Sequence, residues 1–421
     1  MSSTKFITKT HVFPGQHIRQ FAGATRYKEE DTQHLAAKQY IPIRIDHVPG
    51  IGITIIGAPA ISFPKEMYEP LWDEMLAQWT HQEFYISSIW AVDPCNQGES
   101  GVLNEITQGD EPTWVDFARD LLQLINGFRN EFPLPIIGIG HSMGAVALLE
   151  LSHLHPRLFA SLCLFDPVIG DVHNLGPTLI HASSVRRDLW ASREEAEKDF
   201  KSSKSVQKWD DRVLRRWLVH GLRETPTRLY PQPGGITLQT TKANESWSYG
   251  RNWFEPRPWP HSTPTLRMRA KYHDQQASMD RTHSFYRSEM DIVWSDLPHL
   301  NPGCLYILPD QGPMSRKSYT DAKINRTGTG SGGSGGKREN RVSHISVRDT
   351  GHLLPFEKPV ECAGAVVGWL TRDLKIWIEM RELERTERDD KSEDGVSLSK
   401  KWVDEAKACF ENGRAGLRAK L

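Results

Sequence analysis

Gly140-His141-Ser142-Met143-Gly144 has the residue types and spacing of a sharp turn that presents a nucleophile. The apolar residues 136–139 come before this turn, and residues 143–153 after it have helical spacing, so a strand would lead in and a helix lead out. Glycines two positions either side of Ser142 would leave room for such a tight backbone. The pattern predicts that Ser142 is a nucleophile for acyl transfer; the alternative is a tight turn with an idle serine.

A serine hydroxyl needs a base that takes its proton, and position selects His352 among the 17 histidines. His352 follows residues 342–347, the predicted last strand, and precedes a predicted final helix at 359–385. A histidine in this loop would overhang the ends of the strands. The alternative is an ordinary histidine on a surface loop. His141 is next to Ser142, but a turn of this kind would direct it away from the hydroxyl.

Two aspartates are candidates for the acid that holds the second ring nitrogen of the histidine. Asp166 stands at the carboxyl end of the predicted strand 160–165, where side chains of a parallel sheet meet a site, and it would fix the tautomer of the ring. Asp310 follows the predicted strand 304–308, but Gly312 occupies the place where we would look for the acid. We predict Asp166; Asp310 remains open, as does a role for Asp166 in capping the next turn.

Backbone N–H groups would have to stabilise the oxyanion that forms when the hydroxyl attacks a carbonyl. The first predicted donor is the N–H of Met143, at the start of the helix that follows the nucleophile. The second should come from the loop after the predicted strand 51–56, and we nominate the N–H of Ala60 or Ile61.

Short apolar runs alternate with helical patterns in the first half of the chain, which predicts an α/β fold. The sheet should be mostly parallel with helices on both faces, since its strands are short and apolar throughout. The predicted strands are residues 51–56, 84–92, 136–139, 160–165, 304–308 and 342–347, and the predicted helices of the core are 66–79, 114–128, 143–153 and 359–385.

The alternation stops at about residue 166, and a different kind of sequence follows. Residues 170–298 include two charged stretches with helical spacing, 186–201 and 209–222, and then a region rich in Pro and Trp. We interpret 170–298 as a helical cap inserted after the sixth strand, so that residues 1–169 and 299–385 form one core.

Two polar segments complete the predicted organisation. Residues 324–340 contain a run of Gly and Ser and should form a flexible loop. Residues 386–421 form a charged tail that we expect to be partly disordered. The last three residues, Ala419-Lys420-Leu421, have the small–basic–Leu pattern of a peroxisomal address, which predicts a location in the peroxisomal matrix and an import receptor as partner.

Composition excludes several other classes of function. A formal net charge of -1 gives no reason to expect nucleic acid or an anionic membrane surface as partner. No stretch reaches the roughly 18–20 apolar residues of a membrane span, and the first residues lack the pattern of a signal peptide. The five cysteines show no CxxC spacing, so we expect no disulfide framework, no metal site and no cofactor.

Several stretches together resemble one group of fungal enzymes. They are residues 63–72 (FPKEMYEPLW), 93–104 (DPCNQGESGVLN), 188–196 (DLWASREEA) and 351–355 (GHLLP). As a set they resemble the fungal α/β-hydrolases of secondary-metabolite and toxin clusters, the group of the acyl-CoA hydrolase of mycophenolic acid biosynthesis. The resemblance covers most of residues 40–375; the small oxyanion loop and the Gly/Ser insertion depart from it.

The resemblance implies an α/β-hydrolase fold, a triad on Ser142, Asp166 and His352, and hydrolysis of an acyl-CoA thioester to a free acid in the peroxisome. Alternatives are a carboxylester or lactone hydrolase, and a ligand-binding homologue that lacks turnover. A homodimer is a further expectation.

In the cap, Trp190 and Trp253 are candidates for an apolar acyl pocket. Arg186 and Arg187 are candidates for contacts with CoA phosphates. The alternatives are ordinary packing for the tryptophans and a solvated face for the arginines.

Overall fold

The computed structural model describes residues 5–43, 50–80, 83–170, 175–252, 254, 262–274, 284–389 and 395–418. The chain divides into two compact units, Met1–Thr371 and Arg372–Leu421. The first unit contains the sheet and every predicted site residue that the structure describes. The second contains the end of helix α13 (Pro359–Asp389) and helix α14 (Lys400–Arg418).

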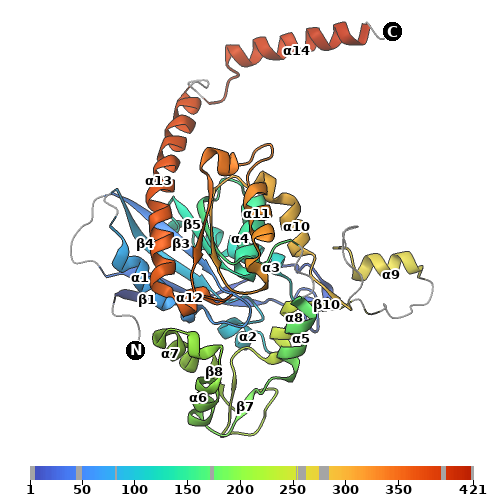
Figure 1. Ribbon diagram of the computed structural model, residues 1–421. Helices are drawn as coiled ribbons and strands as arrows, with labels where there is room; N and C mark the ends of the chain where they lie inside the picture. The colour runs from blue at the N-terminus through green and yellow to red at the C-terminus, as the bar shows by residue number, and fades with distance from the viewer. Residues whose placement is uncertain are drawn as a thin grey trace. The chain divides into compact units, whose positions relative to one another are not determined.

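An eight-stranded sheet forms the centre of the first unit, with the order β1-β2-β4-β3-β5-β6-β12-β13 (Figure 1). All neighbouring pairs from β4 to β13 are parallel, whereas β1 and β2 pair antiparallel to each other and β2 to β4. The six predicted strands are all present. The strands are β1 Phe6–Pro14, β2 His34–Pro42, β3 Ile51–Ala58, β4 Phe84–Val92, β5 Ile136–His141, β6 Phe159–Phe165, β12 Gly303–Pro309 and β13 Val342–Val347.

The sequence analysis does not predict β1 and β2. In β1 the end residues Phe6 and Phe13 are buried, but Ile7 and Val12 are more than half exposed. The apolar residues therefore follow neither the alternation of a half-buried strand nor the continuous run of a buried one. Strands such as β6, in which every residue is buried, have the continuous apolar pattern and are found from sequence.

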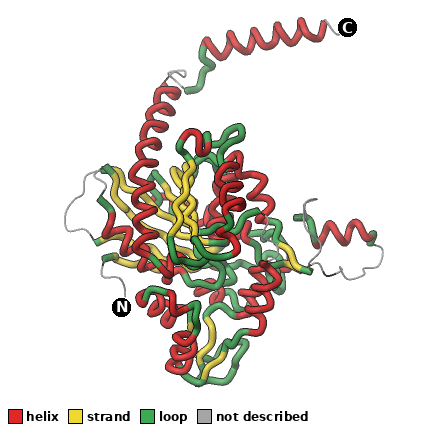
Figure 2. Tube along the Cα trace, in the orientation of Figure 1, coloured by secondary structure: helices red, strands yellow, loops and turns green. Residues whose placement is uncertain are grey.

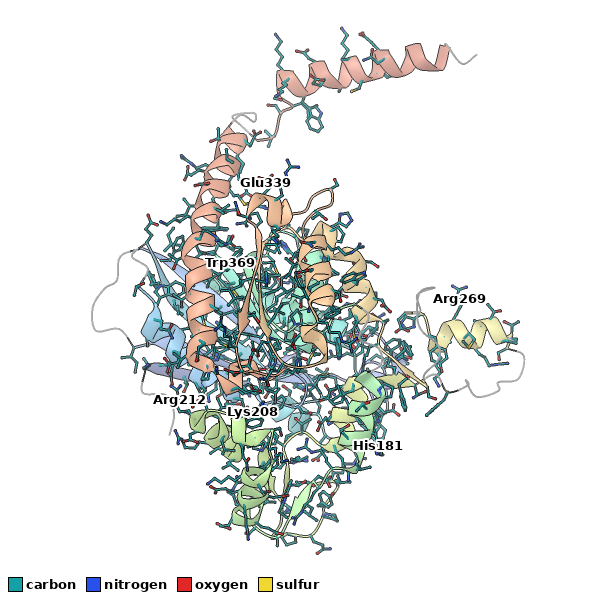
Figure 3. The ribbon with its side chains drawn as sticks, viewed as in Figure 1. His181, Lys208, Arg212, Arg269, Glu339 and Trp369 are labelled. Atoms are coloured by element: carbon teal, nitrogen blue, oxygen red, sulfur yellow. The ribbon has the colours of Figure 1, made fainter. Side chains whose placement is uncertain are left out.

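Helices cover both faces of the sheet (Figures 1 and 2). On one face α1 and α13 are joined by a hydrogen bond of 3.0 Å from Gln78 Nε2 to the carbonyl of Val360. Trp369 of α13, labelled in Figure 3, donates from its indole N–H to Ser161 Oγ of β6 at 2.8 Å. The remaining core helices pack on the other face. The core helices are α1 Glu69–Gln78, α3 Trp114–Gly127, α4 Met143–Leu154, α10 Glu289–Asp296, α11 Lys317–Arg326 and the first part of α13.

The segment between β6 and β12 contains small strands as well as the expected helices, and its role as a cap stays a prediction. Its helices α5 to α8 lie below the sheet in the view of Figure 1. A single helix over 186–201 is wrong, because β7 occupies Leu189–Trp190 and Ser192 caps a new helix by accepting from the Glu195 N–H. The elements are α5 Leu175–Val185, β7, α6 Arg193–Ser202, α7 Asp211–His220, β8 Leu222–Glu224, β9 Ile236–Leu238, α8 Lys242–Tyr249, β10 Arg251–Asn252, α9 Pro264–Lys271 and β11 Phe285–Tyr286.

The two polar segments have more hydrogen-bonded structure than their composition suggests. Within 324–340, backbone N–H groups of Gly328, Gly330 and Ser334 donate to carbonyls of residues 297, 298 and 300 at 2.7–2.8 Å. Flexibility of this loop stays a prediction. The tail, expected to be partly disordered, contains α14, while Ala419, Lys420 and Leu421 lie outside the described residues. Within the described ranges, none of the helices has the length and apolar character needed to span a bilayer.

Candidate active site

Ser142 lies in the turn between β5 and α4 with a strained backbone, at φ 55° and ψ -116°. Its N–H donates to the carbonyl of Phe165 at 2.9 Å, which ties the turn to the end of β6. The two flanking glycines are required by space. A Cβ at Gly140 would lie 2.6 Å from Ala145 Cα, and one at Gly144 would overlap the carbonyl of Ala58. The turn thus holds Ser142, which is 6% exposed, in a geometry that few other sequences could adopt.

The structure brings His352 between Ser142 and Asp166. His352 Nε2 lies 2.9 Å from Ser142 Oγ, and Nδ1 lies 2.7 Å from Asp166 Oδ2. Because an ionised carboxylate can only accept, Nδ1 carries the hydrogen in the neutral ring, and Nε2 is left to accept from the hydroxyl. Asp166 is buried, and its N–H donates to the carbonyl of Ile307 at 3.0 Å. These are the contacts of a nucleophile, its base and an orienting acid.

Asp310, the alternative acid, lies elsewhere. It is exposed, and its Oδ1 accepts from the N–H of Thr350 at 3.2 Å. Hydrogen bonds from the backbone of Asp349 and Thr350 lower the pKa of its carboxyl group. Asp310 therefore contacts the backbone of the loop that carries His352 rather than the imidazole.

The candidate oxyanion donors differ in availability. Met143 begins α4, where N–H groups have no acceptor within the helix. The N–H of Ala60 donates to Tyr68 Oη at 2.9 Å, and the N–H of Ser62 donates to Gln97 Oε1 at 2.6 Å. Within the described part of the chain, the N–H of Ile61 makes no hydrogen bond. Ile61 is therefore the donor that this loop leaves available.

A cavity of about 540 Å³ opens beside Ser142. Ser142, Asp166 and His352 line it together with Ala60 and Ile61. The other lining residues are mostly apolar and come from the core and the inserted segment, and they include Phe63, Trp114, Val168, Leu179, Tyr249, Met290, Met314 and Leu353. Lys208, labelled in Figure 3, contributes an exposed ammonium group to the lining. The space suits an apolar group whose reactive carbonyl lies next to the serine.

Comparison with known proteins agrees with this geometry. A family model described as "Alpha/beta hydrolase family" matches residues 47–365. The chain belongs to the α/β-hydrolase family. It is 34% identical to "Type I acyl-CoA thioesterase mpaH" of Penicillium brevicompactum over 421 residues, which cover 94% of each chain. It is 32% identical to "Type I acyl-CoA thioesterase mpaH" of Penicillium roqueforti over the full length of both.

A solved structure has the same fold at low identity. The peroxisomal α/β-hydrolase Lpx1 of Saccharomyces cerevisiae superposes with a TM-score of 0.66 and 14% identity, covering 93% of this chain and all of that one. At this identity the likeness concerns the fold alone. The predicted fold class and the resemblance to fungal α/β-hydrolases are thus confirmed.

Three of the four predicted substrate residues of this α/β-hydrolase line a second cavity. Arg186, Arg187 and Trp190 line a space of about 440 Å³ that shares Phe63 and Leu353 with the cavity beside the serine. Trp190 is only 2% exposed, so most of its ring packs inside the inserted segment. The two cavities are therefore neighbours, but these three residues do not line the one that contains Ser142.

Both arginines already have carboxylate partners. Arg186 Nη1 lies 2.7 Å from Glu245 Oε2, and Arg187 Nη2 lies 2.6 Å from Glu195 Oε1. A phosphate would have to compete with these carboxylates for each guanidinium. Trp253, the other predicted substrate residue, lies outside the described residues. Contacts of these four residues with a substrate stay predictions.

A buried lysine lies near the carboxylate of Asp166. Lys323 of α11 is fully buried, and its Nζ has no hydrogen-bond partner among the described residues. Burial lowers the pKa of Lys323 to about 8, although the carboxylate of Asp166 acts in the opposite direction. Nζ lies 4.3 Å from the centre of the Tyr319 ring, a contact that favours the charged form in part. The sequence pattern gives no sign that Lys323 is buried.

Sequence reasoning also missed Tyr68 and treated His141 as a residue without a role. Tyr68 Oη lies 2.8 Å from His141 Nδ1, and both side chains are buried. A histidine at the end of an otherwise apolar strand is the signal that could have pointed to this pair.

The elbow glycines generate a first prediction. Gly144→Ala should lower the free energy of unfolding by about 1–3 kcal/mol or more, because the added methyl group meets backbone that cannot move aside. Gly127→Ala, at the end of α3, is the matched control, since a Cβ there has nothing within 4 Å. Urea unfolding of the two variants measures the difference. Equal stability of both would contradict the spatial requirement at the turn.

Lys323 generates a prediction about stability and pH. Below pH 8 the lysine is charged in both the folded and unfolded states, so the full cost of burying its charge lowers the free energy of unfolding. Between pH 8 and its ordinary value of 10.5 the unfolded chain binds more protons, and stability from this group rises with pH. Lys323→Met should therefore raise the free energy of unfolding at pH 7 by about 3 kcal/mol, and the gain should shrink between pH 8 and 10.5.

Urea unfolding at pH 7, 8.5 and 10 measures the effect of Lys323→Met. Lys317→Met is the control on the same helix, since the Lys317 side chain is 87% exposed and its removal should change stability little at any of these pH values. A loss of stability at pH 7 in the Lys323 variant would show that the ammonium group is stabilised where it lies.

Proposed function

We propose that this α/β-hydrolase is a serine hydrolase that cleaves an acyl-CoA thioester to the free acid in a fungal pathway. The observation that carries the proposal is the chain of hydrogen bonds from Asp166 through His352 to Ser142 at the wall of an apolar cavity. Relatives that match nearly the whole chain are named type I acyl-CoA thioesterases. The geometry supports the reaction class, and the relatives support the thioester.

In the acylation step, Ser142 Oγ attacks the carbonyl carbon of the thioester while His352 Nε2 takes the hydroxyl proton. Asp166 stabilises the imidazolium that forms. The N–H groups of Met143 and Ile61 donate to the oxyanion of the tetrahedral intermediate. When the intermediate collapses, the C–S bond breaks, and the proton on Nε2 passes to the sulfur, so that CoA leaves as a thiol.

Deacylation repeats these steps with water. His352 Nε2 removes a proton from a water molecule, and the hydroxide attacks the carbonyl carbon of the acyl-enzyme. Collapse of the second intermediate breaks the C–Oγ bond and returns the proton to Ser142, releasing the free acid. The apolar lining of the cavity is suited to hold the acyl group through both steps.

The finer predictions have different support. A peroxisomal matrix location rests on Ala419-Lys420-Leu421, and an import receptor as partner depends on the same residues. A homodimer stays a prediction from sequence. Among the described residues no group of His, Cys, Asp and Glu is arranged to hold a metal ion, and the proposed steps use only side chains and backbone.

Three variants test the proposed roles. Ser142→Ala should lower kcat for acyl-CoA by on the order of 10⁴- to 10⁶-fold, because no nucleophile remains. Asp166→Asn should lower it by on the order of 10⁴-fold, because the amide favours the wrong ring tautomer. Asp310→Asn is the matched control and should stay within about 3-fold of wild type, since Asp310 contacts backbone only.

Release of free CoA thiol from a panel of acyl-CoAs measures these rates. Wild-type turnover in Ser142→Ala would sink the mechanism. Equal losses of kcat in Asp166→Asn and Asp310→Asn would show that Asp166 is not the acid that orients His352. The ethyl ester of the best acyl group completes the panel: a higher kcat/KM for the ester than for the thioester would contradict the thioesterase assignment and leave a serine esterase.

A further inference from the structure

A buried pair of side chains joins the loop of Ala60 to the loop of His352 without lining the cavity. Tyr68 belongs to the short helix η2 (Lys65–Tyr68), and His141 is the last residue of β5. Tyr68 Oη lies 2.8 Å from His141 Nδ1, and His141 Nε2 lies 2.8 Å from the carbonyl oxygen of His352. Neither Tyr68 nor His141 lines the cavity beside Ser142. Any effect of this pair on the reaction would have to pass through other residues.

The hydrogen atoms in this network have only one arrangement. The carbonyl of His352 can only accept, so His141 Nε2 must carry a hydrogen. Burial holds the pKa of His141 well below its usual range, so the ring is neutral and Nδ1 accepts from the Tyr68 hydroxyl. The oxygen of Tyr68 in turn accepts from the N–H of Ala60 at 2.9 Å. Each donor therefore has one acceptor, and no alternative tautomer satisfies all three contacts.

The two rings are held by their surroundings. The ring of Phe356 lies 5.0 Å from that of Tyr68 and 5.6 Å from that of His141, in edge-to-face contact with both. Lys65, at the start of η2, donates to Asp93 Oδ2 at 2.8 Å, and both side chains are buried. The pair is therefore held in place by hydrogen bonds and by packing against both rings.

The two ends of the network are parts of the proposed machinery. At one end is the backbone of His352, whose side chain is 37% exposed and lies in a loop. The hydrogen bonds of its imidazole change as the proton moves, whereas the bond to its carbonyl does not. At the other end is Ala60, the neighbour of Ile61. The hydrogen bond from the Ala60 N–H to Tyr68 Oη makes this N–H unavailable to the oxyanion. The same bond fixes the peptide group that precedes the one bearing the Ile61 N–H.

We propose that Tyr68 and His141 are positioning residues that hold the base and the oxyanion loop in register with Ser142. This inference rests on the proposed function. A misplacement of about 1 Å at a reacting group can cost on the order of 100-fold in rate, so a fixed backbone at both sites matters to kcat more than to binding of the acyl group.

Four variants of the pair test this inference. Tyr68→Phe and His141→Leu remove the contacts and should lower kcat by about 10- to 100-fold, with KM within about 3-fold of wild type. His141→Gln keeps an amide N–H that can reach the carbonyl of His352, and should recover most of the rate. The double variant Tyr68→Phe/His141→Leu should be no slower than His141→Leu alone, because both changes break one network.

Rates are expressed per active site, titrated with a fluorophosphonate probe of Ser142, so that a loss of folded protein does not count as a loss of kcat. Tyr40→Phe is the matched control. Tyr40 is a buried tyrosine that donates to Glu69 at 3.0 Å. Among the described residues its hydroxyl bonds to Glu69 and to no member of the network, so this variant should lose stability but keep kcat per titrated site.

Wild-type kcat per titrated site in both Tyr68→Phe and His141→Leu would overturn the inference, as would an equal loss in Tyr40→Phe. If His141→Leu yields no titratable protein, Tyr68→Phe decides the question by itself. Undiminished turnover by Ser142→Ala, measured in parallel, would overturn the proposed function instead, so the two failures are distinguishable.

Discussion

The turn at Ser142 holds a residue with a side chain at positive φ between two positions that admit no side chain at all. This combination is costly for an isolated chain, and it persists because a strand enters and a helix leaves in fixed directions. The N–H of Ser142 is bonded to β6, and α4 begins at the next residue. The direction of the hydroxyl and the direction of the first free N–H of the helix are therefore set together.

Strand order then brings the remaining groups to the same edge. β5, β6, β12 and β13 are parallel neighbours, so their carboxyl ends lie side by side, and Ser142, Asp166 and His352 follow the first, second and fourth of them. Asp166 is bonded through its N–H to β12, as Ser142 is to β6. Each of these two residues is thus held by the backbone of the strand next to its own, which leaves their side chains free to face the histidine.

Sequence alone could predict the features that repeat in a simple pattern or depend on neighbours in the chain. Buried strands such as β6 can be found because they are nearly continuous apolar runs, and the elbow because its glycines lie within two residues of the serine. β1 was missed because half of its apolar side chains face outward. Asp166 and Asp310 could not be separated with certainty, because the choice depends on which strand end the histidine reaches.

The contacts that sequence could not supply join residues far apart in the chain. His141 finds partners 73 and 211 positions away, so nothing in its immediate neighbourhood distinguishes it from a packed histidine. The choice between Ala60 and Ile61 likewise depends on the hydroxyl of Tyr68, which takes one of two adjacent N–H groups. The burial of Lys323 is hidden for the same reason, since only the folded chain shows that its side chain is enclosed.

The ion pairs of Arg186 and Arg187 have a consequence for any polyanionic carrier group that reaches the second cavity. Each guanidinium is already neutralised, so an arriving phosphate would exchange one anionic partner for another instead of filling an empty electropositive site. Displacing Glu245 from Arg186 would also leave a buried carboxylate without its cation, which disfavours the exchange. A carrier that gains so little from the two arginines would dissociate readily once the bond to its cargo is cut.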